Sequence, residues 1–446
     1  MRVKLTLILL LASLLLHAEP LTLDSCLQLA LDNNVSIRKA DLSLMRAQEV
    51  RREALTKYFP QVDASGFAFH ALHPLLEASI DDVDNTTARE LLNTLYDQVG
   101  EPMGFGRSIA MFHHGVHASV TAVQPIFMGG KIIAGNKLSR LGVEAAELQQ
   151  DIARRDALLE VEEAYWLVVC LREKEQLLQS MQDMLDTVSL FVDAAVEAGL
   201  AVENDRLRVR LKQSELRSHM IELSDALPLA QRALCRTIGI PYSDSVSVVL
   251  PPLPDQEMQL EAAQPAQNVQ PERQLLHLNL QAEELRKHMS VADALPQIVL
   301  MGAYGYGNML NPEGIPGTDP WKWNGALAVT MRVPLTGWWE TAHKIREHDY
   351  AIREAQLTEQ DMSEALELRH IQSSNALHTQ LAVFEQKQLA YQLSEENFSH
   401  MRDQYSAGLA TISELLEAQT LLEQSRTELI DARTAYLIAL HRAEKF

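Results

Sequence analysis

The chain has 446 residues, of which 47% are hydrophobic, 6% aromatic and 22% charged. Its formal net charge is -21, and a surface of that sign repels nucleic acid, so nucleic-acid binding is excluded as a function. Its three cysteines, Cys26, Cys170 and Cys235, are too few and too scattered for a disulfide framework or a metal cluster. A single disulfide between Cys26 and Cys235 stays open as an alternative.

The amino-terminal stretch reads MRVKLTLILLLASLLLHA. It has a basic start, an apolar run from Leu5 to Leu16 and a small residue, Ala18, where a peptidase would cut. This pattern predicts a signal peptide over residues 1–18. No later stretch approaches the roughly 18 consecutive apolar residues of a membrane-spanning helix. Export without a helical anchor leaves secretion, the periplasm or an outer-membrane β-barrel.

The sequence contains an internal repeat. The phrase Ala-Gly-Leu-Ala occurs around Gly199 and again around Gly408, 209 residues later, and Pro125 and Pro334 are separated by the same 209 residues. Self-similarity at a fixed offset indicates two copies of one structural unit. Pro60 matches Pro296 at an offset of 236, so the first copy carries an insertion of 27 residues. We expect a first repeat over 19–238, a Pro-rich linker over 239–271 and a second repeat over 272–446.

Each repeat is expected to contain two long helices. The first repeat has apolar residues spaced by three and four at Leu178, Met181, Leu185, Val188, Val192 and Ala195, and the second at Leu415, Ala418, Leu422, Ser425, Leu429, Ala432, Tyr436 and Ala439. This is the seam of antiparallel coiled-coil helices. The glycines of the repeated phrase suit the left-handed end of a helix. The predicted helices cover 131–198, 202–238, 338–407 and 411–446.

A β-hairpin is expected before the long helices of each repeat, over about 60–127 and about 296–335. Apolar residues alternate with polar or small ones, as in WKWNGALAVTMRV, which indicates strands with one apolar face. The hairpins supply four strands in all, and four strands of about ten residues cannot close a barrel alone. Four aromatic side chains near one end of the second hairpin suggest a membrane girdle: Tyr304, Tyr306, Trp321 and Trp323. A loop insertion at 71–110 interrupts the first hairpin, with a short helix expected over Ala88 to Tyr96.

This order of elements resembles the TolC-like outer-membrane efflux protein family. The resemblance lies in LTLDSCLQLALDNN, a hairpin ending in QPIFMGGK, a long helix, the AGL turn and a returning helix, followed by the same order again. It implies a mainly helical mixed fold, in which three protomers form a twelve-stranded outer-membrane barrel continuous with a periplasmic α-helical tunnel. Residues 239–271 would then also belong to an equatorial belt. The implied location is the outer membrane of a Gram-negative bacterium, with a large periplasmic part.

The resemblance also implies a function and partners. The chain would be the exit duct of a tripartite efflux or type I secretion system, working as a homotrimer with a periplasmic adaptor and an inner-membrane transporter, without a cofactor. The cargo, whether drug, metal ion or polypeptide, is not indicated. The alternative is a coiled-coil envelope protein, structural or adhesive, without a conducting lumen. Alternating strands favour the duct, since a spacer has no use for them.

Candidate functional residues lie at the helix tips. Glu414 and Glu417, three residues apart on one helix face, match the position of the family's acidic constriction. Asp205 and Tyr405 match a network that holds neighbouring helices together in some members, although Ala410 stands where the family often has an arginine. The resemblance further implies adaptor contact at Gly199, Leu200, Gly408 and Leu409. The alternatives are that the two glutamates are solvated helix-face charges and that the other four residues only form turns.

Enzymatic function is not expected. The sequence contains no HExxH, GxSxG or P-loop motif, and no catalytic residue is proposed. Five histidines, His70, His73, His113, His114 and His117, gather around the first hairpin and leave a surface metal site as a minor alternative. Histidines on exposed loops are commonly solvated, so no metal is predicted.

Overall fold

The structure is a computed structural model that describes residues 21–73, 75–111, 114–242, 248–249, 271–308 and 321–445. The predicted signal peptide and most of the Pro-rich segment lie outside the described residues. The chain divides into two compact units, each built from both halves of the sequence. The helical unit comprises residues 1–46, 144–278 and 356–446, and the sheet unit comprises 47–143 and 279–355.

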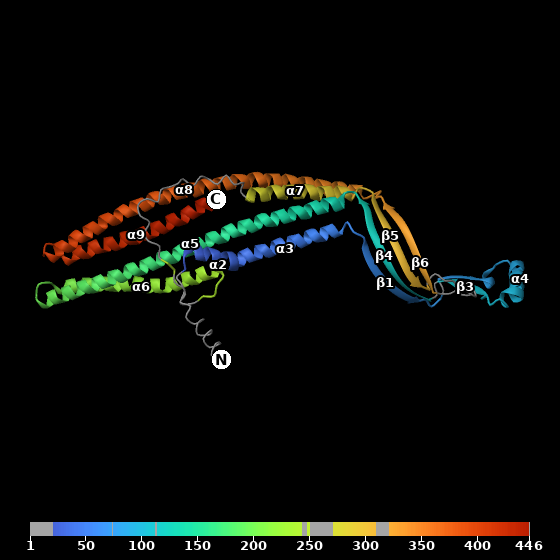
Figure 1. The fold of residues 1–446 in the computed structure, drawn as a ribbon, viewed down its shortest axis with the longest axis horizontal. Coiled ribbons are helices and arrows are strands. Elements are labelled where there is room, and N and C mark those ends of the chain that lie inside the picture. The colour runs from blue at the N-terminus through green and yellow to red at the C-terminus, as the bar shows by residue number, and fades with distance from the viewer. Residues whose placement is uncertain are drawn as a thin grey trace, which may run out of the picture. The chain divides into compact units, whose positions relative to one another are not determined.

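The long helices of Figure 1 follow the apolar periodicity of the sequence. Each pairs with a returning helix in the helical unit, α5 with α6 and α8 with α9. Their bounds, with those of the shorter helices, are α2 Leu23–Asn33, α3 Val35–Thr56, α5 Lys131–Glu197, α6 Glu203–Ile238, α7 Pro271–Ala292, α8 Trp338–Ser406 and α9 Ile412–Lys445. At 1.5 Å per residue, α5 with its 67 residues is on the order of 100 Å long.

The apolar seam forms the core of the helical unit. Leu185 and Val209 are fully buried between α5 and α6, and Leu415 of α9 joins the same cluster. One expected seam position is displaced, because Leu429 is half-buried whereas Ile430 is buried. The later seam positions Ala432, Tyr436 and Ala439 are buried as expected, so the deviation is local.

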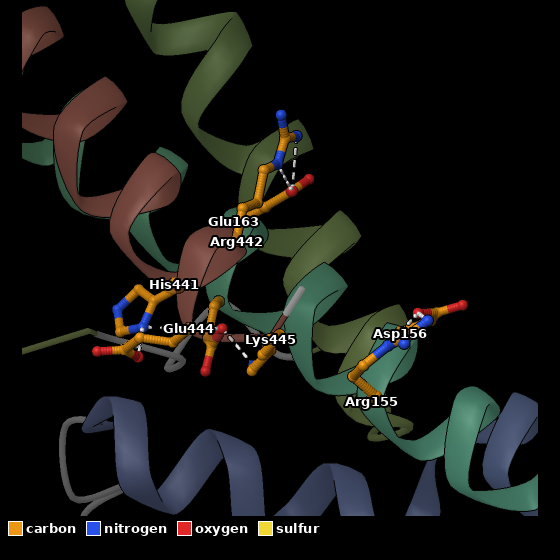
Figure 2. Close-up of polar contacts among 8 residues, drawn as sticks. Arg155, Asp156, Glu163, His441, Arg442, Glu444 and Lys445 are labelled. Carbon is orange, nitrogen blue, oxygen red and sulfur yellow. Dashed lines mark hydrogen bonds and ion pairs between the residues drawn. The ribbon is translucent and has the colours of Figure 1, made fainter. Parts of the chain in front are cut away.

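Ion pairs fasten the last turns of α9 to α5, as Figure 2 shows. The Lys445 Nζ lies 2.5 Å from Glu162 Oε2, and this carboxylate is almost completely buried. Arg442 reaches Glu163 at 2.7 Å. A more deeply buried pair lies farther along the same two helices, where Arg433 Nη2 meets Glu173 Oε1 at 2.5 Å. Charges inside a helical core persist only when they are paired in this way.

The three cysteines are free, buried thiols. Cys26 belongs to α2 and Cys235 to α6, two helices in contact. Burial raises the pKa of the Cys26 thiol to about 11, with a smaller contribution from Cys235. Burial also raises the pKa of Cys170 to about 11. The structure therefore does not contain the disulfide considered from the sequence.

Four strands form one antiparallel sheet in the order β1-β4-β5-β6. Their bounds are β1 Gln61–His70, β4 His114–Met128, β5 Gln297–Gly307 and β6 Lys322–Arg332. β1 and β6 are the two edges, because each pairs with a single described strand. Pro125 sits beside a β-bulge in β4, at a register shift between Pro125 and Phe127, the kind of position where a missing N–H is tolerated.

The register places the apolar residues of β6 on the same face as Tyr304 and Tyr306 of β5, Val120 of β4 and Val62 of β1. Tyr306 pairs with Trp323 and with Ala118, and two residues farther along Tyr304 pairs with Gly325 and Val120. The opposite face is mixed. It carries Ser65 and Ser119, whose hydroxyls lie 3.3 Å apart, but also the stacked rings of Phe67 and Phe69 on β1 and Met301 on β5. Strand alternation therefore produces one continuous apolar face, as the sequence pattern predicts.

The insertion folds into additional elements at the end of the sheet where β1 ends and β4 begins. Two short strands, β2 Leu76–Ser79 and β3 Ser108–Met111, pair in antiparallel fashion. Between them lie a 3-10 turn at Ile80–Asp82, helix α4 Thr86–Leu95 and a π-helical turn at Tyr96–Gly100. The four strands expected from the two hairpins are present as β1, β4, β5 and β6, and the predicted short helix of the insertion is present as α4. The two short strands of the insertion were not predicted.

Candidate functional site at the helix tips

The two helical hairpins end in the same kind of turn. Gly199 has a φ of 70° and Gly408 a φ of 74°, both left-handed. In each turn the glycine N–H and the following leucine N–H return to carbonyls of the last helical turn; Leu200 donates to Ala195 O at 2.8 Å and Leu409 to Gln404 O at 2.9 Å. This is the Schellman pattern of helix ends. A Cβ at either glycine would meet open space, so the backbone conformation alone selects glycine.

Each turn presents one exposed leucine. Leu200 is 84% exposed and Leu409 is 80% exposed. A single exposed apolar residue is ordinary on a protein surface. Here the two leucines occupy the same place in two similar turns, so each hairpin ends in an apolar tip.

Two acidic side chains cap the starts of α6 and α9, the helices that return from the tips. Glu414 Oε2 accepts hydrogen bonds from the Thr411 N–H at 2.7 Å and the Thr411 hydroxyl at 2.9 Å, while the Glu414 N–H donates to Thr411 Oγ1 at 3.3 Å. This is a capping box, and its hydrogen bonds hold the pKa of Glu414 below its usual range. Asp205 lies at the corresponding position of α6 and accepts from the Val202 N–H at 3.3 Å.

Asp205 and Tyr405 both line one cavity at the tips, whose volume is about 980 Å³. Arg402 also lines it. Burial raises the pKa of Tyr405, and the charge of Asp205 adds to this effect. Gln419 borders the same cavity, and its buried amide oxygen and nitrogen have no hydrogen-bond partner. The cavity therefore combines apolar walls with polar groups that suit a polar ligand or a protein backbone.

The remaining acidic candidate, Glu417, is exposed on α9, three residues beyond Glu414. Between the hairpins, Arg208 of α6 donates to the Ser413 hydroxyl of α9 at 2.7 Å. Within the first hairpin, Arg206 pairs with Asp193 at 2.7 Å and with Glu203 at 2.9 Å. The tips are thus held by polar contacts, whereas the helices above them are held by their apolar seam.

The predicted aromatic girdle residues form one cluster at the far end of β5 and β6. Ring centroids lie 5.2 Å apart for Tyr304 and Trp323, 4.9 Å for Tyr306 and Trp323, and 5.5 Å for Tyr306 and Trp321. As for metals, the described residues contain no group of three or more His, Cys, Asp or Glu side chains that could hold an ion. His113 and the side chain of His114 lie outside what the structure describes.

Comparison with known proteins places this architecture in a family. A model of the outer membrane efflux protein family matches residues 26–239 and 258–443. The chain belongs to the outer membrane efflux protein family. Its function is accordingly that of an outer-membrane efflux channel, and its location is the outer membrane, with a large helical part in the periplasm. A search of the curated proteins finds no match.

Solved structures of outer-membrane proteins have the same fold. The Campylobacter jejuni outer membrane channel CmeC is 15% identical, with a TM-score of 0.76 over 95% of this chain and 84% of that one. VceC from Vibrio cholerae is 14% identical, with a TM-score of 0.73 over 95% and 96%. The open state of MtrE from Neisseria gonorrhoeae is 14% identical, with a TM-score of 0.72 over 95% and 88%. As in this efflux family, the fold is mainly helical with a small sheet.

None of the helices in the described part of the chain is long and apolar enough to cross a membrane.

Sequence reasoning missed several residues of the tip. The capping role of Glu414 is visible in the motif Thr411-Ile-Ser-Glu414, because Thr followed three residues later by Glu is a capping box signature. The contact between Arg208 and Ser413 has no such signal, since it joins residues 205 positions apart. The amide of Gln419, which has no hydrogen-bond partner, could not be predicted either, because its position beside the α9 seam is typical of a core residue.

Proposed function

We propose that three copies of this chain assemble into a twelve-stranded outer-membrane barrel continuous with a periplasmic helical tunnel. The observation that carries the proposal is the four-stranded sheet, whose edges β1 and β6 each pair with only one described strand. In lipid, unpaired backbone N–H and C=O groups cost several kcal/mol each, so an open edge must find a partner strand. β6 of one copy pairing with β1 of the next closes the ring after three copies, without a new type of contact.

The apolar face of the sheet supports a lipid-facing orientation. It runs through Leu327, Val329 and Met331 on β6, all exposed in the single chain. The aromatic cluster of Tyr304, Tyr306, Trp321 and Trp323 would mark the outer membrane interface, where such side chains are enriched. The other face, which carries Ser65 and Ser119 together with Phe67 and Phe69, would line the lumen. In this arrangement residues 19–238 and 272–446 are two structural repeats, each contributing one hairpin and two long helices, joined by 239–271.

The tips would be the contact for the other parts of the pump. A periplasmic adaptor and an inner-membrane transporter must deliver cargo to the tunnel end, and the apolar residues there, Leu200 and Leu409, beside the turns at Gly199 and Gly408, offer a surface for it. The 980 Å³ cavity between the hairpins suits a polypeptide segment that pairs with the amide of Gln419. Asp205 and Tyr405 in its wall would then form part of the aperture network.

We place the narrowest point of the tunnel at Glu414 and Glu417. In a trimer these residues form two rings of three carboxylates, and acidic rings favour the passage of cations. The structure separates the two residues in one respect, because Glu414 is already engaged in the capping box of α9. Glu417 is the cleaner probe of the ring.

The assembly is tested by its mass in mild detergent. Native mass spectrometry of the purified protein is expected to give a trimer. A stable monomer that retains its sheet would contradict the proposal, because the strand edges would then be satisfied within one copy.

The constriction is tested by ion selectivity in planar bilayers. Glu417→Lys should lower or reverse the preference for cations while the trimer stays intact, because three positive charges replace three negative ones in a confined passage. Glu203→Lys is the control, since it changes the same charge at the other tip. Equal selectivity in wild type, Glu417→Lys and Glu203→Lys would place the constriction elsewhere.

A further inference from the structure

Helix α4 in the insertion packs with its polar side inward. Asn93 Oδ1 accepts a hydrogen bond from Arg107 Nη2 at 2.7 Å. Tyr96 donates its hydroxyl to the Phe105 carbonyl at 3.0 Å, and the Arg107 guanidinium lies over the Tyr96 ring at 5.4 Å. Arg107 directly precedes strand β3, so this arginine connects the polar face of α4 to the β2–β3 hairpin of the insertion.

The apolar side of the same helix is left uncovered. Leu91 is 63% exposed, Leu92 39%, Leu95 51% and Val99, in the turn that follows, 51%. Leu92, Leu95 and Val99 are spaced by three and four residues, the spacing with which helices pack side by side. Ordinary surface helices turn such a face toward their own core. An exposed face of this kind indicates a partner.

The charge of the insertion distinguishes between a lipid surface and a protein surface as the partner of this apolar face. Residues 71–110 carry seven carboxylates and two guanidinium groups. Helices that lie on a membrane surface are typically rich in Lys and Arg on the polar face, because these residues are attracted to anionic lipid. The acidic insertion lacks that attraction, whereas the apolar face of α4 contains no charge of its own. The same face of another copy is an apolar match that brings no carboxylate into the contact, because Glu90 and Asp97 lie on the opposite side of the helix.

The area of the apolar face of α4 determines whether this contact can form between separate chains or only between chains that are already held together. Four partly exposed side chains bury at most a few hundred Å², far below the roughly 800 Å² per partner of a stable free-standing interface. Two separate chains would not associate through it. Copies already held together by their strands, however, present these faces at high effective concentration, and a small contact then suffices.

We propose that the apolar face of α4, formed by Leu91, Leu92, Leu95 and Val99, packs against the same face of the other copies and forms a three-helix cap over the outer end of the channel. The proposal rests on the trimer proposed above. It also rests on the position of the insertion, which joins the ends of β1 and β4 remote from the helices; Figure 1 shows α4 beyond that end of the sheet.

The test uses the full-length chain in the outer membrane of intact cells. Leu95→Cys places a thiol in the proposed contact, and Glu90→Cys places one on the exposed polar side of the same helix. The native thiols are buried and do not interfere. Under mild oxidation Leu95→Cys is expected to give disulfide-linked dimers, as two thiols lose two protons and two electrons to the added oxidant, while Glu90→Cys stays monomeric on denaturing gels.

A second measurement on the same variants is the rate of labelling by a membrane-impermeant maleimide. Leu95→Cys should react at least about tenfold more slowly than Glu90→Cys, because its thiol is accessible only when the cap opens locally. Equal rates would show a bare face and overturn the proposal. Slow labelling without cross-linking would also overturn it, because lipid or another molecule would then cover the face.

The trimer is checked separately. Mass measurement of the same preparations in mild detergent shows whether three copies are present. A trimer without Leu95→Cys cross-links refutes the cap and leaves the channel proposal standing, whereas a monomer refutes the channel proposal itself.

Discussion

The helical unit and the sheet unit handle their apolar side chains in opposite ways. Leu185, Val209 and Leu415 are at most 3% exposed within one chain of the helical unit. On β6, Leu327 is 77% exposed, and every residue of the strand is exposed. Burying a leucine contributes about 1.5–3 kcal/mol, so the helical unit obtains this stabilisation from its own chain. In the proposed trimer, the sheet obtains it from lipid and neighbouring copies.

The largest effect is expected where the helical unit buries charge. Arg433→Met leaves Glu173 without its partner in a largely buried site, since the side chains of Arg433 and Glu173 are 3% and 17% exposed. Removing one partner of a buried pair costs about 3–5 kcal/mol. Urea unfolding of the helices, followed by circular dichroism in detergent, measures the loss.

Two controls sharpen this prediction. Arg442→Met removes an equivalent but half-exposed pair with Glu163 and should cost at most about 1 kcal/mol. The double variant Arg433→Met, Glu173→Met should recover most of the loss, because no unpaired charge remains. Equal losses for Arg433→Met and Arg442→Met would contradict the account of the core.

The next largest effect is expected on the sheet, where adjacent residues face opposite sides. Leu327→Arg puts a charge on the apolar face and should destabilise the proposed barrel by about 2–4 kcal/mol for a residue near the bilayer midplane. Ala328→Arg, one residue on, points to the other face and should cost much less. Folding equilibria in lipid vesicles give both values. If the two arginines cost the same, the apolar face is not the lipid face.

A smaller effect is expected at the tips, which depend on caps rather than on a core. Thr411→Ala removes the hydroxyl cap of α9 and should cost about 1 kcal/mol. Val202, at the equivalent place before α6, has no side-chain cap, so Val202→Thr should stabilise that helix start by a similar amount. Hydrogen exchange of the first-turn amides measures both. Identical exchange in Val202→Thr and wild type would mean that this cap does not form.

The smallest effect concerns pH at the same tip. The folded-state pKa of Glu414 is lowered by its hydrogen bonds to Thr411. The stabilisation is therefore present above the unfolded pKa of about 4.3 and is lost as the pH falls through the folded value. Protection factors at the start of α9, corrected for intrinsic exchange, should fall in wild type below about pH 4. Glu414→Gln should abolish this pH dependence, whereas Glu417→Gln should keep it.

The sequence predicted what repeats locally and missed what depends on distant partners. Gly199 and Gly408 mark helix ends because left-handed conformation is a property of a single residue. Alternation along β6 assigned its faces, because strand geometry has a fixed period of two. The link from Arg208 to Ser413 required the positions of two hairpins, which no local pattern contains.

The insertion shows the limit of periodicity most clearly. A helical pattern over Ala88 to Tyr96 predicts a helix, and α4 is present. Ordinary reasoning would turn Leu91 and Leu95 inward. The structure turns them outward, because Arg107 attracts the polar face instead. Which side of a helix is buried therefore depends on a residue outside the helix.

The pairing of β4 with β5 has a consequence for the time course of folding. His117 meets its partner Gly307 across 190 residues of chain, and contacts between such distant residues form slowly. Until β5 has arrived, β1 and β4 are an isolated hairpin, which is at best marginally stable in water. Their apolar residues and unpaired edge are then open to aggregation. A chain that must reach the outer membrane in this condition needs protection in transit. The need persists after the second hairpin has paired, because β1 and β6 are still open edges and β6 is still fully exposed.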